Sequence, residues 1–145
     1  KKIPAWLIII IILVIGFGLI QLIPLGSGIT NPPVTNEPNW DSPATREIAK
    51  RACFDCHSNE TTHPWYSKIA PGSWLLVRDV KEGRRAMNFS DWPTDAVIQR
   101  ETANEIREIL LEGEMPPIQY TIIHPHSKLN NAEIDQLVGG LGVNK

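Results

Sequence analysis

The sequence predicts an all-helical domain over residues 42–145, preceded by one apolar helix at the N-terminus. Three observations support this fold class. The chain has 145 residues, which is enough for one ordinary domain. Apolar residues recur at helical spacing in four segments after residue 42, and no segment shows the alternation of a half-buried strand. The first 23 residues, by contrast, form a nearly continuous apolar run.

The apolar run over residues 3–23 predicts a transmembrane anchor. It contains no charged residue, and Gln21 is its only strongly polar side chain. A helix of 21 residues rises about 31 Å, close to the bilayer core of about 30 Å. Trp6 lies near one end and two lysines precede the run, so the N-terminus is expected in the cytoplasm. We expect residues 1–24 to be a single-pass anchor in the cell membrane, with the following domain on the extracytoplasmic, or periplasmic, side.

A cleaved signal peptide is the alternative interpretation of this run, because small residues follow it at positions 26–28. The run exceeds the usual apolar region of a signal peptide, about 7–15 residues, which favours an uncleaved anchor. Residues 24–41 contain four prolines and two glycines. That composition predicts a non-helical linker over residues 25–41.

Four helices are predicted after the linker. The first is capped by Ser42, the second covers residues 73–83, the third covers residues 93–113, and the fourth starts at Asn130 with Glu133 completing a capping box. Long ordered loops are expected between them, over residues 57–72 and 114–129. The apolar positions expected to face the core are Ala44, Ile48 and Ala52 in the first helix, Trp74, Val77 and Val80 in the second, Val97, Ile98, Ile106, Ile109 and Leu110 in the third, and Ile134, Leu137, Val138 and Leu141 in the fourth.

Charge and cysteine content exclude two classes of protein. The 14 basic and 16 acidic residues give a net charge of −2, without the basic excess of a nucleic-acid-binding protein. Two cysteines are too few for a disulfide-rich scaffold.

The segment Cys53-Phe54-Asp55-Cys56-His57 carries the chemistry. Cys-x-x-Cys-His is the attachment motif of c-type haem. The two thiols lie about one helical turn apart, so both reach the two vinyl groups of one porphyrin, and His57 follows directly to bind the iron. We therefore expect one covalently attached haem c, with Cys53 and Cys56 as anchors and His57 as an iron ligand.

The motif has two other interpretations. A thioredoxin-like redox pair is expected in a βαβ context, which the sequence lacks. A structural zinc site needs four ligands, so two histidines would have to complete one.

The second axial ligand of the iron has five candidates. Met115 is favoured because Pro116 and Pro117 stiffen the loop that carries it, and a Met/His pair raises the reduction potential. Met87 is interpreted as a packing residue. The remaining candidates are His63, His124 and His126, and an open sixth position stays a further alternative.

Aromatic residues and arginines are candidates to surround the haem. The aromatic residues either cover the macrocycle or simply form the core of the domain: Trp40, Trp65, Trp74, Trp92, Phe54, Tyr66, Phe89 and Tyr120. Arg78, Arg84 and Arg85 either pair with the haem propionates or form a solvated helix face.

With these residues in view, the chain resembles a class I cytochrome c, and more closely the cytochrome c-like haem-binding domain family. Three segments carry the resemblance and cover most of residues 45–140: CFDCHSNETTHPWYSKIAPGSW, DVKEGRRAMNFSDW and GEMPPIQYTIIHPHSKLNNAEI. The resemblance implies a monohaem c-type domain with Cys53 and Cys56 as thioether anchors, His57 as proximal ligand and Met115 as distal ligand.

The function expected from these residues is electron transfer rather than catalysis. A membrane-anchored cytochrome would carry single electrons between redox proteins, either freely or as a subunit of a respiratory or photosynthetic membrane complex. No nucleic acid and no small-molecule substrate are expected as partners. The alternative is a haem peroxidase or a gas or redox sensor with an open or displaceable sixth position, with His63 or His124 as a distal acid or base.

Overall fold

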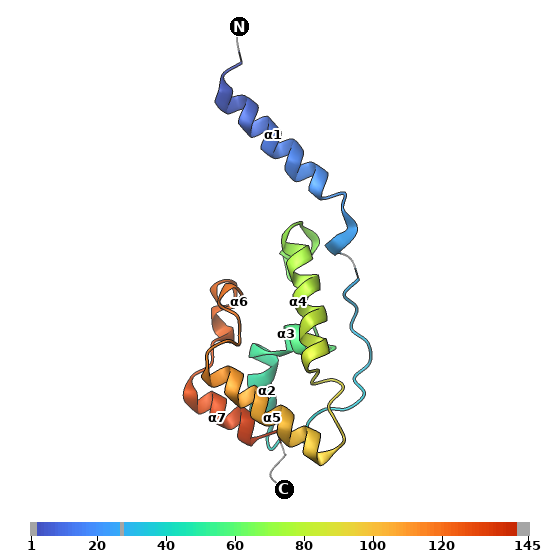
Figure 1. Cartoon of the computed structure of the whole chain (residues 1–145), viewed down its shortest axis with the longest axis vertical. Coiled ribbons are helices and arrows are strands. Elements are labelled where there is room, and N and C mark those ends of the chain that lie inside the picture. The colour runs from blue at the N-terminus through green and yellow to red at the C-terminus, as the bar shows by residue number, and fades with distance from the viewer. Residues whose placement is uncertain (1–2, 27, 142–145) are drawn as a thin grey trace. The chain divides into compact units, whose positions relative to one another are not determined.

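The computed structural model of the protein describes residues 3–26 and 28–141, and its regular elements are helices (Figure 1). Within the described residues there is one isolated β-bridge, between Asn36 and Asp91, and no longer strand. The all-helical prediction is thereby confirmed for this part of the chain. In chain order the elements are α1 (Ala5–Ile20), the 3₁₀ helix η1 (Pro24–Gly26), α2 (Pro43–Ala52), α3 (Phe54–His57), η2 (Trp65–Lys68), α4 (Gly72–Ala86), α5 (Ala96–Leu111), α6 (Ile118–Ile123), η3 (Pro125–Ser127) and α7 (Asn131–Gly139).

The first helix corrects the prediction of a membrane anchor. Helix α1 has 16 residues, whereas the apolar run has 21. A helix of 16 residues rises about 24 Å, less than the bilayer core of about 30 Å. Among the described residues, no helix combines the length and the apolar character needed to cross a membrane. The predicted transmembrane helix and the predicted single-pass location in the cell membrane are therefore wrong; Lys1 and Lys2, which gave the predicted orientation, lie outside the described residues.

Gln21 explains why α1 ends before the apolar run does. Its side-chain amide donates to the carbonyl of Ala70 at 3.1 Å, and its side-chain oxygen accepts from the Ala70 N–H at 2.9 Å. Both polar groups of Gln21 are thus engaged by backbone from a distant part of the chain. The backbone then turns, with Leu22 and Ile23 bonded three residues back rather than four.

The chain divides into two compact units. One comprises residues 1–29 and 63–79, and the other comprises residues 30–62 and 80–145. The second unit contains the Cys-x-x-Cys-His motif and the helices that surround it, so the candidate site is described within that unit. The assignment of residues 42–145 to one haem-binding domain stays a prediction.

In the second unit, α7 contacts both α2 and α5. Gly140, just after α7, lies against the start of α2 with no room for a side chain, because a Cβ there would lie 2.6 Å from the Thr45 side chain. Thr45 is fully buried and its hydroxyl donates to Asp41 at 2.6 Å. The Asp41 N–H in turn donates to the Gly140 carbonyl at 2.9 Å. These contacts join the first and last helices of the unit.

The core of this unit is built from aromatic and aliphatic side chains. Phe89 stacks on Trp92 with ring centroids 5.7 Å apart, and on Phe54 at 5.4 Å. Trp40 packs against Phe89 at 5.5 Å. Of the two roles considered from the sequence, covering a haem or forming the core of the domain, these four aromatic residues have the second. The buried aliphatic residues that complete the cluster are Ala49, Ala103, Leu110, Ile134, Leu137, Val138 and Leu141.

The starts of α2 and α7 follow the sequence signals, whereas α4 continues to Ala86, past the predicted end at residue 83, and both predicted loops contain short helices: η2 lies within residues 57–72. Ser42 caps α2, and Asn130 and Glu133 form the predicted capping box of α7. Residues 114–129, expected to be irregular, contain α6 and η3. The three isoleucines of α6 are exposed and Thr121 alone is buried, so α6 lacks the apolar periodicity that reveals a helix.

Gly140 and its neighbour Gly139 give a matched test of this packing. Gly140→Ala should lower the free energy of unfolding by about 1–3 kcal/mol, because relief of the clash requires the buried Thr45 to move. A Cβ added at Gly139 would meet no atom within 4 Å, so Gly139→Ala should be neutral or stabilising by up to about 1 kcal/mol. Urea unfolding of both variants measures the difference, and equal midpoints would contradict the packing described.

Candidate haem-binding site

The Cys-x-x-Cys-His motif starts at Cys53, directly after α2, and its other four residues form the single turn of α3. The Cys53 carbonyl accepts from the Cys56 N–H at 3.2 Å and from the His57 N–H at 2.9 Å. Phe54 is buried in the core, while Cys53, Cys56 and His57 are half-buried. The motif is therefore anchored by Phe54, and its two cysteines and its histidine lie at the boundary between the core and the surface.

Both cysteines are reduced thiols. Burial and the neighbouring Cys56 sulfur raise the pKa of the Cys53 thiol to about 12, against a smaller opposing effect of Arg51. Cys53 therefore keeps its proton at neutral pH. Among the described residues there is no group of three or more His, Cys, Asp or Glu side chains placed to hold a metal ion, so the zinc interpretation of the motif has no support here.

The backbone of the residues after α4 orients the His57 imidazole. His57 Nδ1 lies 3.2 Å from the carbonyl oxygen of Met87. A carbonyl only accepts, so Nδ1 carries the hydrogen and Nε2 presents its lone pair. Burial lowers the pKa of His57, and the carbonyls of Met87 and Gly83 oppose that effect in part. The neutral imidazole with a free Nε2 is the form that binds iron.

Gly83 allows α4 to lie directly against the motif. A Cβ at Gly83 would lie 2.6 Å from the Cys56 carbonyl oxygen and 3.1 Å from the Cys56 Cβ. Arg84, the next residue, donates from Nε to the Ser58 carbonyl at 2.7 Å. The close approach brings the end of α4 into position for the contact between Met87 and His57.

Arg84 is committed to the protein itself. Its guanidinium also donates to the Thr30 carbonyl at 2.8 Å, to Asn31 Oδ1 at 3.0 Å and to Thr61 Oγ1 at 2.9 Å. Burial lowers the pKa of Arg84. These contacts support a structural role for Arg84 rather than the propionate pairing considered from the sequence.

Gly113 ends α5 and begins the loop that carries Met115. It adopts φ +74°, a left-handed conformation that glycine tolerates best. The Gly113 N–H donates to the Leu110 carbonyl at 3.2 Å and the Glu114 N–H donates to the Ile109 carbonyl at 3.1 Å. This pair of bonds is a Schellman motif, which stops α5 and reverses the chain.

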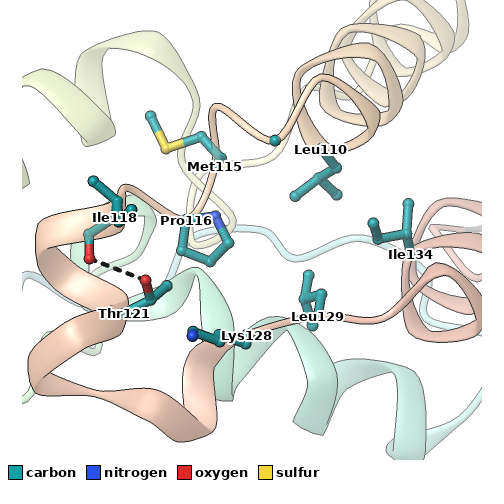
Figure 2. Close-up of a pocket in the computed structure, with 9 residues that line it drawn as sticks. Leu110, Met115, Pro116, Ile118, Thr121, Lys128, Leu129 and Ile134 are labelled. Carbon is teal, nitrogen blue, oxygen red and sulfur yellow. Dashed lines mark hydrogen bonds between the residues drawn. The ribbon is translucent and has the colours of Figure 1, made fainter.

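Met115 lies at the edge of an open hollow of about 270 Å³. In Figure 2, Leu110, Leu129 and Ile134 converge on its centre, with Pro116 facing them. Cys53 packs against the same core cluster as these aliphatic residues. The hollow is close to the lower end of the range for cofactor sites, about 300–1,000 Å³. Its lining is completed by Gly113, Ile118, Thr121 and Lys128.

The other candidate ligands have different surroundings. Met87 is half-buried and packs against the core, as its interpretation as a packing residue implies. His124 stacks on Tyr120 with ring centroids 4.5 Å apart. It also contacts His126 in an edge-to-face arrangement, with ring centroids 5.6 Å apart. His63 belongs to the other compact unit, so it is not described relative to the motif.

Sequence reasoning missed one pair of side chains at the site. Tyr120 donates its hydroxyl hydrogen to Asp55 Oδ2 at 2.6 Å, so a residue of α6 bonds to the residue between Phe54 and Cys56. The two partners lie 65 positions apart, and neither has a local pattern that points to the other.

These observations fit a haem. Two thiols one turn apart suit two thioether bonds, and an oriented neutral imidazole suits an iron ligand. The hollow beside Met115 is lined mainly by aliphatic side chains, as a porphyrin face requires, but Cys53, Cys56 and His57 do not line it. Cys53, Cys56, His57 and Met115 are the residues that would hold it.

A substitution at Gly83 tests the contact between α4 and the motif. Gly83→Ala should destabilise the protein by about 1–3 kcal/mol, because the added Cβ meets backbone atoms of Cys56 that have no room to move. Lys81→Ala, at an exposed position of the same helix, is the control and should stay within about 0.5 kcal/mol of the parent protein. Thermal unfolding compares them, and equal stability of the two variants would show that the approach is loose.

Comparison with known proteins places the chain in a family. Neither the curated proteins nor the solved structures contain a match to it. The model of the haem-binding domain family matches residues 15–142, which include the motif, the Met115 loop and α7. The chain therefore belongs to the haem-binding domain family.

Proposed function

We propose that this haem-binding protein is a monohaem c-type cytochrome that transfers single electrons between protein redox partners. The observation that carries the proposal is the turn at Cys53, which presents two reduced thiols and an imidazole whose Nδ1 is held by the Met87 carbonyl. A bound haem supplies one-electron chemistry, because its iron alternates between the ferric and ferrous states.

The thiols of Cys53 and Cys56 would hold the haem covalently. In each case the thiol would add across a vinyl double bond of the haem, with sulfur bonding to one vinyl carbon and the hydrogen going to the other. Atoms and electrons balance without an oxidant. The tight turn that spaces the two cysteines supports this attachment.

His57 and Met115 would be the two protein ligands of the iron. The Met87 carbonyl keeps the lone pair of His57 on Nε2, and the Schellman motif at Gly113 with the prolines after Met115 limits the motion of the thioether. A thioether and an imidazole together favour the ferrous state and raise the reduction potential. A fixed pair of ligands changes little between oxidation states, which suits electron transfer.

Covalent attachment is tested by the two cysteines. In the full chain matured with haem, the haem should stay on the polypeptide through acid–acetone extraction and denaturing electrophoresis. Cys53→Ala and Cys56→Ala should each shift the pyridine haemochrome band, because one vinyl group stays unreacted, and the double variant should release all of its haem. Complete extraction of haem from the unaltered protein would rule out the c-type assignment.

The distal ligand is tested by the two methionines. Met115→Ala should abolish the methionine-to-iron charge-transfer band and lower the reduction potential by on the order of 0.1 V, out of the span of about 0.8 V that axial ligands set. Met87→Leu, which keeps the packing, should leave both quantities unchanged. An unchanged spectrum in Met115→Ala would overturn the ligand assignment, and carbon monoxide binding by the unaltered ferrous protein would favour an open-site peroxidase or sensor instead.

A further inference from the structure

Two side chains of the motif region reach from α2 and α3 to the segment that follows the Met115 loop. Arg51, two residues before Cys53, donates to the carbonyls of His126 and Lys128, the latter at 3.0 Å, and pairs with Glu133 at 2.5 Å. Asp55, two residues after Cys53, accepts from the Tyr120 hydroxyl. The segment of α6 and η3 is therefore fastened to the motif at two separate points.

The point at Tyr120 is well fixed on both sides. The other oxygen of the Asp55 carboxylate accepts from the Thr62 N–H at 3.0 Å. This second bond orients the carboxylate independently of Tyr120. The Tyr120 ring stacks on His124, and both side chains are half-buried. A hydroxyl that donates to a carboxylate makes a stronger bond than one between two neutral groups.

The segment between Met115 and Tyr120 has little slack. Pro116 and Pro117 fix two φ angles directly after Met115. The Pro117 carbonyl accepts from the Tyr120 N–H at 3.0 Å and from the Thr121 N–H at 3.0 Å. These bonds join the first turn of α6 to Pro117, which only Pro116 separates from Met115.

We propose that Tyr120 is a positioning residue for the sixth ligand: its bond to Asp55 holds α6 against the motif and so keeps the Met115 loop closed. This inference rests on the proposed function, in which Met115 binds the iron. Without the bond, the loop opens at its α6 end while Arg51 keeps η3 in place. External ligands then compete more easily with Met115.

Tyr120→Phe tests this role, with Tyr66→Phe as the matched control at the other tyrosine of the chain. Phenylalanine keeps the ring that stacks on His124 and removes only the hydroxyl. The ferric haem-loaded Tyr120→Phe protein should bind imidazole about tenfold more tightly, measured by absorption titration, because less free energy is needed to open the loop. Tyr66→Phe should bind imidazole like the unaltered protein.

A second background separates positioning from a general loss of structure. When Met115 is already replaced by alanine, Tyr120→Phe should add no further gain in imidazole affinity, because the loop has no ligand left to release. An equal gain in that background, or no gain in Tyr120→Phe alone, would overturn the proposal. An unchanged spectrum in Met115→Ala would contradict the assignment of Met115 as iron ligand, and with it the proposed function. That result differs from one in which Met115 is the ligand but Tyr120→Phe has no effect, which would contradict only the role of Tyr120.

Hydrogen exchange gives a readout that needs no haem. Backbone amides of α6 should exchange at least threefold faster in Tyr120→Phe than in Tyr66→Phe, in both the haem-free and haem-loaded proteins, while amides of α7 keep their rates. Asp55→Asn, which retains an acceptor for the Thr62 N–H and replaces the bond to the carboxylate by a bond to a neutral amide, provides a second variant and should show a smaller effect of the same sign on α6. Unchanged exchange in both variants would show that the hydroxyl does not hold the helix.

Discussion

The site depends on the close approach between the end of α4 and the Cys-x-x-Cys-His turn. Gly83 lies against the backbone of Cys56, with no space for a side chain. In the residues that follow, the Met87 carbonyl accepts from the imidazole of His57. The Phe89 N–H donates to the His57 carbonyl at 2.8 Å. The same stretch then sends Phe89 into the aromatic core. One close contact thus sets the hydrogen-bonding state of the imidazole, fixes the direction of the motif and joins the site to the core.

Features encoded by neighbouring residues were predictable from the sequence. The Cys-x-x-Cys-His motif is complete within five residues, and the family match supports the haem binding expected from it. The start of α2 at Ser42 and of α7 at Asn130 depends on caps that the chain supplies within three residues. The end of α5 near Gly113 depends on the left-handed conformation of a single glycine. Each of these signals has a local physical cause, so a reader of the sequence alone can find it.

Features that depend on distant contacts were not predictable in this way. The apolar run at the N-terminus suggested a longer helix, but Gln21 is bonded to backbone 49 positions away and α1 stops before it. In α5, Ile98 was expected in the core and is exposed, whereas the small residue Ala103 is buried because another helix packs over it. Short α6 has exposed isoleucines, so periodicity gives no signal for it. Packing between elements decided all three outcomes, and packing cannot be read from spacing alone.

The two sides of the motif are held by different kinds of interaction. On the side of His57, the partners are backbone carbonyls and N–H groups, which a substitution of side chains leaves in place. On the side of α6 and η3, the partners are the side chains of Arg51, Asp55 and Tyr120. Backbone contacts within a packed turn resist change, whereas a bond between two half-buried side chains opens at a smaller cost in free energy and is removed by one substitution. In the proposed cytochrome, the position of the His57 imidazole would therefore be fixed by backbone contacts, whereas side-chain changes would adjust how firmly Met115 is held.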